Sequence, residues 1–284
     1  MARKNRRPVK DLDSMHMVLP FLMNNRCDAE VYIAEKIDVT ALLKYLEKKN
    51  DGLIKEDKTT IFHAINTAIA KTIYLRPHLN RYIQGKKFFD RDEISLSFVA
   101  KKQFTDKAED MLIRLVINED DNIDIIKNRV LDKVRKTRSE ESRGMNGFLD
   151  VITKGPNFLI AFIAFVIKSL DYYGLLPDSF MEMDPNYSTV LLTNLGSIKC
   201  NQVYHHLNNY GTNSIVMAIG TIHKEDVYIN ETKKTCDIVE IGVTLDERVG
   251  DGFYFAKSIK LFKFLIENPK LLDLPIKEEV DYEL

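Results

Sequence analysis

The sequence predicts an α+β protein in which one mixed sheet is layered with helices. Long segments with apolar residues at helical spacing alternate with short segments of period two, and no strict strand-helix-strand repeat orders them. The chain has 284 residues, enough to bury a large core without disulfides or a metal. No linker rich in glycine, serine or proline divides it. We therefore expect a basic N-terminal arm over 1–14 and a single domain over 15–284.

Four segments have the periodicity of a helix with one apolar face. A helix start is expected at Asp38-Val39-Thr40, and isoleucine at every fourth position predicts a second helix over 59–75. A third helix is expected over 120–138, and a last one begins after Gly252. Period-two alternation and β-branched runs predict strands over 91–101, 189–192, 214–219 and 237–245.

The segment 158–167 is a run of ten apolar residues. A helix that crosses a bilayer needs roughly 20 apolar residues, so this run is half the required length. We expect it to form a buried helix that ends at Gly174, in a cytoplasmic protein with no membrane partner.

Charge and cysteine content exclude several classes of protein. With 41 Lys+Arg against 42 Asp+Glu, no global field draws the chain to nucleic acid or to an anionic membrane. Five cations nevertheless lie in the first ten residues, which indicates a frayed or subunit-clasping arm, with a nucleic-acid-binding tail as the alternative. Cys27, Cys200 and Cys236 have unrelated spacings, typical of a reducing compartment, and are expected to be small core residues.

The most unusual local sequence is Asp246-Glu247-Arg248-Val249-Gly250-Asp251-Gly252, with four charged residues in seven. Asp251 stands where it can cap the following helix, and Gly252 permits close backbone approach. From composition alone, a solvated turn with an N-cap explains the segment.

This loop resembles the D-H-R-x-x-D-G signature in the catalytic domain of dihydrolipoamide acyltransferases, the acyl-transferring component of 2-oxo acid dehydrogenase complexes. That domain shares its fold with chloramphenicol acetyltransferase. Other stretches resemble the family in the same order, over about residues 15–273: Lys36 to Thr40, Arg76 to Ile83, Thr193 to Gly196, and Gly242 to Leu272. The resemblance implies a chloramphenicol acetyltransferase-like two-layer sandwich, a mixed sheet packed with helices.

The resemblance also implies three site residues. In the family, a histidine four positions before the signature's second aspartate takes the proton from the thiol of coenzyme A, but Glu247 stands there in this chain. Burial would strengthen Glu247 as a base, whereas pairing with Arg248 or with a cation of a neighbouring subunit would make it structural, and both alternatives stay open. Thr193 has the position of the hydroxyl that donates to the tetrahedral oxyanion, or it is an ordinary strand-end hydroxyl. Asp251 has the position of a structural salt-bridge carboxylate.

The implied ligands and partners follow from the same resemblance. Coenzyme A or acyl-CoA is the expected substrate, in a homotrimer whose active sites lie between subunits. Lys107, in a tripeptide that matches lipoylated lysines, is expected to be an ordinary surface residue. Since no lipoyl domain surrounds it, we expect no covalent lipoyl group on this chain and a separate lipoyl carrier protein. No metal and no nucleic-acid partner are expected.

The sequence is compatible with three functions. The first is transfer of an acyl group between a dihydrolipoyl-type thioester and coenzyme A. The second is a catalytically inactive trimeric homologue that serves as a scaffold or binding module. The third is an acetyltransferase of a small hydroxylated acceptor, which the residues around Glu247 weaken. Among the histidines, His63 is expected to pack in the core, His16 is a candidate partner of Asp251, and the adjacent His205 and His206 cannot chelate one metal by themselves.

Overall fold

The computed structural model describes residues 6–101, 110–139, 152–229 and 231–282. The helices are α1 (Ser14–Leu22), α2 (Thr40–Lys49), α3 (Ile61–Leu75), α4 (Ile123–Ser139), α6 (Asn157–Tyr173), α7 (Asp178–Met183) and α8 (Gly252–Glu267). The strands are β1 (Arg6–Pro8), β2 (Glu30–Asp38), β3 (Arg81–Gln84), β4 (Lys87–Arg91), β5 (Ile94–Lys101), β6 (Asp110–Ile117), β7 (Val190–Asn194), β8 (Ile215–Ile229) and β9 (Thr232–Asp246). The predicted helices and strands are confirmed, with shifted ends.

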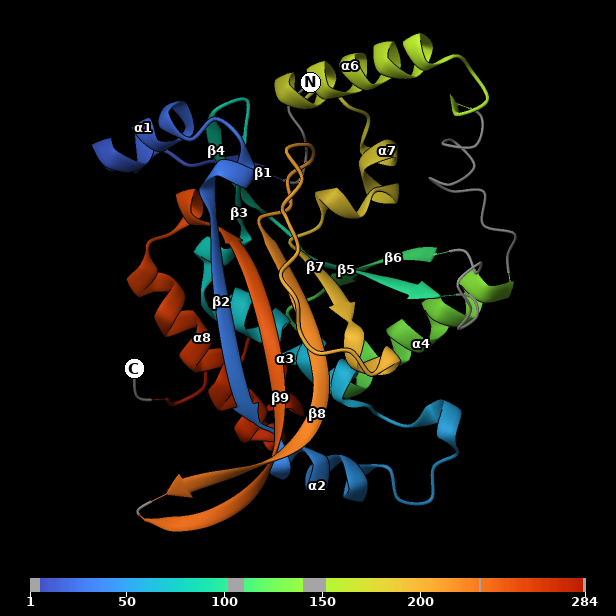
Figure 1. The fold of residues 1–284 in the computed structure, drawn as a ribbon, viewed down its shortest axis with the longest axis vertical. Coiled ribbons are helices and arrows are strands. Elements are labelled where there is room, and N and C mark those ends of the chain that lie inside the picture. The colour runs from blue at the N-terminus through green and yellow to red at the C-terminus, as the bar shows by residue number, and fades with distance from the viewer. Residues whose placement is uncertain (1–5, 102–109, 140–151, 230, 283–284) are drawn as a thin grey trace.

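The main sheet has six strands in the order β2-β9-β8-β7-β5-β6 (Figure 1). Strand β7 runs parallel to both of its neighbours, and the other pairs are antiparallel. The sheet is therefore mixed, and the predicted α+β class is confirmed.

Helices α3 and α8 cover one face of this sheet (Figure 1). The isoleucine stripe of α3 is buried at Ile65, Ile69 and Ile73, and Phe255 and Leu265 of α8 belong to the same apolar core. Burying a side chain of this size stabilises the fold by roughly 1.5–3 kcal/mol. The packing of α8 on β2 fixes the loop that joins β9 to α8.

Part of the basic arm is built into the fold. Strand β1 pairs with β4, which pairs with β3, so a second sheet of three strands forms beside the first. The Arg6 guanidinium donates to Gln84 Oε1 at 2.5 Å and lies 4.2 Å from the centre of the Phe89 ring. Arg7 bonds Asp92 at 2.6 Å. At these residues the arm is a paired strand, not a frayed end.

Helix α6 contradicts the expectation of a buried helix over 158–167. Phe158 is 77% exposed, Phe162 62% and Phe165 68%, and Asp171 is the buried residue of the helix. The apolar run predicted burial, but the body of the chain contacts mainly the C-terminal part of α6, which leaves the rest of the helix uncovered (Figure 1). Gly174 ends α6 in the left-handed conformation, as predicted. Among the described residues, no helix has the length and apolar character needed to cross a bilayer.

The cysteines divide between core and surface. Cys236 is buried, as expected, but Cys27 and Cys200 are exposed, so the core assignment is wrong for these two. Cys27 lies in the short 3₁₀ turn before β2 (Arg26–Ala29), and Cys200 lies in the connection between β7 and β8, where the chain runs over the surface. The Cys27 thiol donates to the Leu207 carbonyl at 3.0 Å. Burial raises the pKa of this thiol, and the nearby carboxylates of Glu30 and Asp28 raise it further.

The stretch between β7 and β8 crosses the sheet in close contact with it. A Cβ atom on Gly242 of β9 would lie 2.5 Å from the Val203 carbonyl oxygen, and one on Gly220 of β8 would lie 2.6 Å from the Gln202 nitrogen. Tyr204 then meets Tyr32 of β2 edge to face, with ring centres 5.3 Å apart. The two glycines therefore let this stretch cross from β8 to the edge strand β2.

Candidate active site

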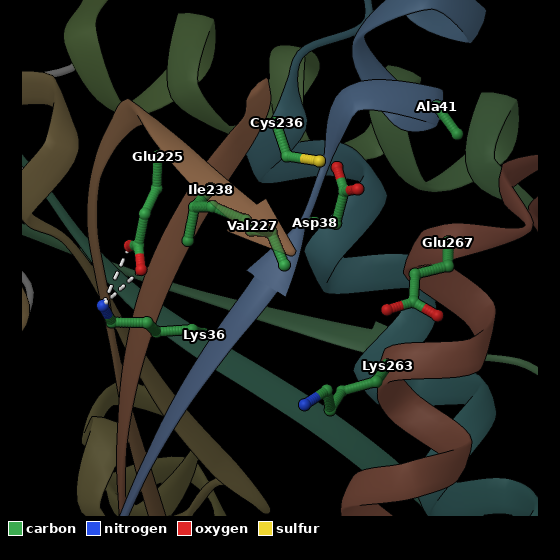
Figure 2. A pocket seen from close by; sticks show the side chains of 9 residues that line it. All are labelled: Lys36, Asp38, Ala41, Glu225, Val227, Cys236, Ile238, Lys263 and Glu267. Carbon is green, nitrogen blue, oxygen red and sulfur yellow. Dashed lines mark hydrogen bonds and ion pairs between the residues drawn. The ribbon is translucent and has the colours of Figure 1, made fainter. Parts of the chain in front are cut away.

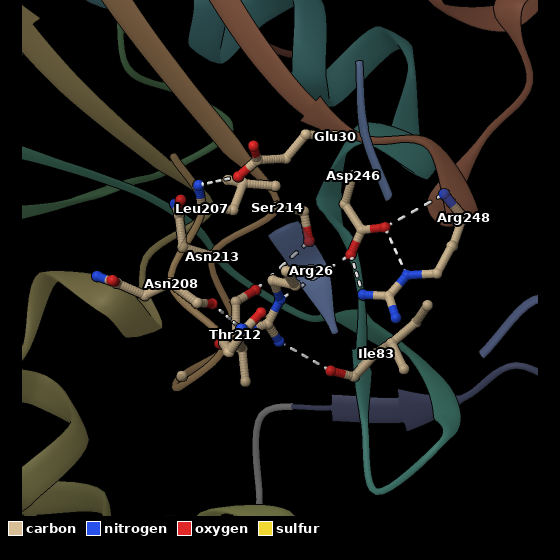
Figure 3. Close-up of polar contacts among 12 residues, drawn as sticks. Arg26, Glu30, Ile83, Leu207, Asn208, Thr212, Asn213, Ser214, Asp246 and Arg248 are labelled. Atoms are coloured by element: carbon tan, nitrogen blue, oxygen red, sulfur yellow. Dashed lines mark hydrogen bonds and ion pairs between the residues drawn. The ribbon is translucent and has the colours of Figure 1, made fainter. Parts of the chain in front are cut away.

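The loop after β9 is held by a buried ion pair. Asp246 is fully buried at the end of β9 and accepts from Arg248 at Nε (2.7 Å) and Nη2 (2.6 Å) and from its backbone N–H (3.2 Å) (Figure 3). Arg248 also donates from Nη1 to the Met23 carbonyl at 2.8 Å, which ties the loop to the end of α1. The partner of Arg248 is thus Asp246, not Glu247.

Arg26 is a second buried cation beside this pair (Figure 3). Its Nη1 donates to the Asn208 carbonyl at 3.0 Å and its Nη2 to the Ile83 carbonyl at 2.9 Å, while Nε lies 3.9 Å from Asp246 Oδ2. Burial lowers the pKa of Arg26, and the Asp246 carboxylate opposes that shift. No sequence pattern marked Arg26, because its contacts come from segments far apart in the chain.

Glu247 is exposed at the start of a short 3₁₀ turn (Glu247–Val249). Among the described residues, it makes no hydrogen bond and no ion pair. It lines a groove of about 700 Å³ between β2 and α8, together with Val31, Phe255 and Lys260. Glu247 therefore has neither the burial nor the Arg248 pairing that the sequence left open.

Asp251 caps α8. Its side chain accepts from the Tyr254 backbone N–H at 2.7 Å, as the sequence predicts. The carboxylate is exposed, and within the described part of this single chain it forms no ion pair. Its family role as a salt-bridge carboxylate stays a prediction.

Thr193 lies on β7, distant from Glu247 within one chain. Thr193 pairs with Ala218 of β8, which pairs with Gly242 of β9, whereas Glu247 follows Asp246 at the end of β9. Four residues along a strand and two strand spacings across give about 16 Å between Thr193 and Asp246. An oxyanion donor must lie roughly 3 Å from the reacting oxygen. The two side chains of one chain cannot act on the same substrate atom.

A buried carboxylate on β2 positions His206 near the same strand end. Glu30, whose backbone pairs with Asp246, bonds His206 Nδ1 at 2.9 Å and accepts from the Leu207 N–H at 2.5 Å. Burial acts to raise the pKa of Glu30, but these bonds and one from Tyr32 hold it below its usual value. The His206 side chain is 79% exposed. Spacing gave no signal for this pair, since Glu30 is far from His206 in the sequence.

The other histidines have structural surroundings. His63 accepts from the Thr60 N–H at 3.0 Å in a capping box at the start of α3, and burial lowers its pKa to about 4. It is a packed, satisfied residue, as expected. His16 bonds Asp13 at 2.6 Å instead of Asp251.

A second cavity, of about 600 Å³, lies beside the projecting β8–β9 hairpin (Figure 2). Lys36 bonds Glu225 at 2.9 Å on one side of the cavity, and Asp38, Cys236 and Glu267 are among its other lining residues (Figure 2). No group of three or more His, Cys, Asp or Glu side chains in the described ranges is arranged to hold a metal ion. Lys107 lies outside the described residues.

One family of known proteins matches a segment of the chain that contains both β7 and the loop after β9. Residues 179–274, which contain Thr193, Glu247 and Asp251, match the family model described as the catalytic domain of the 2-oxoacid dehydrogenases acyltransferase. The chain therefore resembles this acyltransferase catalytic domain. No curated protein sequence matches the chain significantly.

Solved structures show that the fold of the acyltransferase domain extends over nearly the whole chain. A probable dihydrolipoamide acetyltransferase from Listeria monocytogenes is 18% identical and has a TM-score of 0.58, covering 92% of this chain and 95% of that chain. A truncated catalytic core of the 2-oxoacid dehydrogenase multienzyme complex from Thermoplasma acidophilum is 15% identical, with a TM-score of 0.56 over 93% of this chain and 99% of that chain. Chloramphenicol acetyltransferase is 13% identical, with a TM-score of 0.50 over 93% and 98%. The predicted chloramphenicol acetyltransferase-like fold is confirmed.

Proposed function

We propose that the chain is a coenzyme A-dependent acyltransferase that moves an acyl group between a dihydrolipoyl-type thioester and coenzyme A. The match of residues 179–274 to the acyltransferase domain carries this proposal, because it contains both the Thr193 strand end and the loop with Glu247. A separate lipoyl carrier protein supplies the acyl group.

The active site in this proposal is shared between copies of the chain in a homotrimer. The separation of about 16 Å between Thr193 and the end of β9 supports this, since Glu247 of one copy needs the Thr193 hydroxyl of another. The exposure of Glu247 leaves it accessible to a neighbouring copy.

The proposed reaction is a thioester exchange. Glu247 takes the proton from the coenzyme A thiol, and the thiolate forms a bond to the acyl carbon. The carbonyl electron pair moves onto oxygen, where the Thr193 hydroxyl of the other copy donates a hydrogen bond, an interaction typically worth about 3–4 kcal/mol. Collapse expels the dihydrolipoyl sulfur, which receives the proton back.

The exposure of Glu247 favours the alternative of an inactive trimeric scaffold. A carboxylate in water is a much weaker base than imidazole, and Glu247 is exposed to solvent. The two proposals differ in whether the chain binds coenzyme A.

Calorimetric titration with coenzyme A decides between them. Binding is expected for the acyltransferase, and no binding at millimolar ligand would exclude it. An acyl-transfer assay then compares wild type with Glu247→Gln, which is expected to lose about 10²- to 10⁴-fold in kcat. Unchanged activity in Glu247→Gln excludes Glu247 as the base, and a gain in Glu247→His identifies a site that has lost its usual residue.

A further inference from the structure

The exposed aromatic residues of α6 lie on one face of the helix. Phe158, Phe162, Phe165 and Tyr172 are 46–77% exposed. At 3.6 residues per turn these four positions fall within a sector of about 80°. The helix therefore presents an aromatic stripe to the outside.

Buried hydrogen bonds fix this orientation. Asp171 of α6 accepts from Gln84 Nε2 at 3.0 Å, from the Tyr187 hydroxyl at 2.7 Å and from the Gly211 N–H at 3.1 Å. Turning the stripe inward would break these three bonds and leave a buried carboxylate without partners, which is strongly unfavourable. The exposure of the stripe follows from how α6 is anchored.

A second apolar helix lies at the same end of the molecule (Figure 1). The β3–β4 turn joins the two: a Cβ on Gly85 would lie 2.6 Å from the Tyr172 carbonyl oxygen of α6, and Lys86 Nζ donates to the Pro20 carbonyl of α1 at 3.2 Å. Helix α1 exposes Phe21 (60%) and Leu22 (69%). We call these exposed apolar residues of α1 and α6 the apolar end: Met17, Phe21, Leu22, Phe158, Phe162 and Phe165.

The exposed charges of the segment 152–175 are positive. Lys154 precedes α6 and Lys168 lies on its flank, whereas Asp171, the acidic residue of the segment 152–175, is buried. Tyr172 and Tyr173 follow at the end of the helix, 46% and 72% exposed. Phenylalanine on one face, tyrosine beside it and lysine at the flanks is the arrangement of helices that lie in a membrane interface.

A protein partner fits this surface less well. Protein interfaces carry about one hydrogen bond per 100–200 Å² and are depleted in lysine. Apart from the Tyr172 hydroxyl, the polar side chain within the stripe is Ser169, whose hydroxyl already donates to the Phe165 carbonyl at 2.8 Å. Lipid acyl chains need no hydrogen-bond partner, and anionic headgroups complement Lys154 and Lys168.

We propose that the apolar end rests on the surface of an anionic phospholipid bilayer, with α6 lying in the plane of the headgroups. Helix α6 has 17 residues and is about 25 Å long, shorter than the hydrocarbon core of roughly 30 Å. It attaches to one leaflet and does not span the membrane. This attachment is independent of acyl transfer.

The absence of tryptophan from the chain provides a direct test. Phe162→Trp places a single reporter in the stripe, and Tyr228→Trp is the matched control, since Tyr228 is 71% exposed on the distant β8–β9 hairpin. Each variant is mixed with vesicles of phosphatidylcholine alone or of equal parts phosphatidylcholine and phosphatidylglycerol. We expect a blue shift of Phe162→Trp emission on the mixed vesicles, no shift of Tyr228→Trp, and affinity at least about tenfold weaker without phosphatidylglycerol.

The double substitution Phe158→Asp with Phe165→Asp, in the Phe162→Trp background, should weaken vesicle binding at least about tenfold while circular dichroism stays unchanged. Absence of the blue shift on the mixed vesicles, or the same shift in Tyr228→Trp, overturns the proposal. Light scattering tests the alternative that a second copy of the chain covers the apolar end. If the wild type does not bind vesicles and the double substitution dissociates an oligomer, the apolar end is a contact between copies. The membrane proposal is then wrong.

Discussion

Arg248 neutralises a carboxylate that the fold has taken out of water. Asp246 is fully buried and the Arg248 side chain is 3% exposed. Breaking such a pair by removing one partner leaves a buried charge, whereas the pair as a whole contributes little beyond an apolar replacement. Arg248 therefore compensates the charge of the buried Asp246 at the end of β9. The pair fixes the start of the loop.

We predict that Arg248→Met destabilises the protein by about 3–5 kcal/mol. Urea unfolding at fixed protein concentration measures the change. The control is Lys224→Met, because Lys224 is 75% exposed and 3.4 Å from Asp237, a type of pair worth about 0–1 kcal/mol. Equal losses in the two variants would contradict the assignment of Arg248 as the counter-ion of a buried charge.

At the scale of elements, the packing of the stretch 199–213 across the sheet depends on glycine. The Val203 carbonyl occupies the space that a side chain of residue 242 would take. Strand β9 gains no side-chain packing at this position, and its glycine is explained by the close approach of another backbone.

Gly242→Ala and Gly252→Ala test this contact as a matched pair. A Cβ on Gly242 would lie 2.5 Å from a backbone oxygen, but one on Gly252 would meet no atom within 4 Å. We expect Gly242→Ala to destabilise the protein by about 1–3 kcal/mol, as overpacking does. Gly252→Ala, at the start of α8, should be neutral or slightly stabilising in thermal or urea unfolding. A neutral Gly242→Ala would show that the crossing stretch can move aside.

At the scale of the whole molecule, the distance between Thr193 and Glu247 prevents both side chains of one chain from acting on the same substrate. The register of β7, β8 and β9 places Thr193 about 16 Å from Asp246, the residue before Glu247, and no rotation of side chains closes that gap. An active site that uses both residues needs two copies of the chain.

Mixed oligomers test the shared site. Thr193→Ala and Glu247→Gln are each expected to lose at least about 10²-fold in acyl transfer. A co-expressed mixture should recover part of it, because some interfaces then contain the intact residue from each copy. Light scattering of wild type is expected to give a trimer. A monomer with full activity, or no recovery in a mixture that forms hybrid trimers, would contradict the shared site.

The sequence by itself determined the elements and the fold class. Helical spacing at Ile61, Ile65, Ile69 and Ile73 and period-two alternation in 94–98 depend on local geometry, so they are readable without a structure. Asp251 as the cap of α8 is local in the same sense, since cap and helix are adjacent in the chain. The resemblance over the loop 246–252 also comes from the sequence, and with it the acyltransferase hypothesis.

The tertiary structure decided which partner each buried charge has and whether each apolar segment is buried or exposed. The approach of Arg26 to Asp246 and the bond between Glu30 and His206 join segments that the sequence separates widely. Arg248 has an acidic residue on either side of its position in the loop, at 246 and 247, and the fold decides that it pairs with Asp246. Composition predicted a buried helix over 158–167, but burial depends on what packs against a helix, and the helices of the body leave α6 uncovered. The net charge of -1 is a sum over the whole chain and does not show where charges gather. The structure places Lys154 and Lys168 beside an exposed aromatic face.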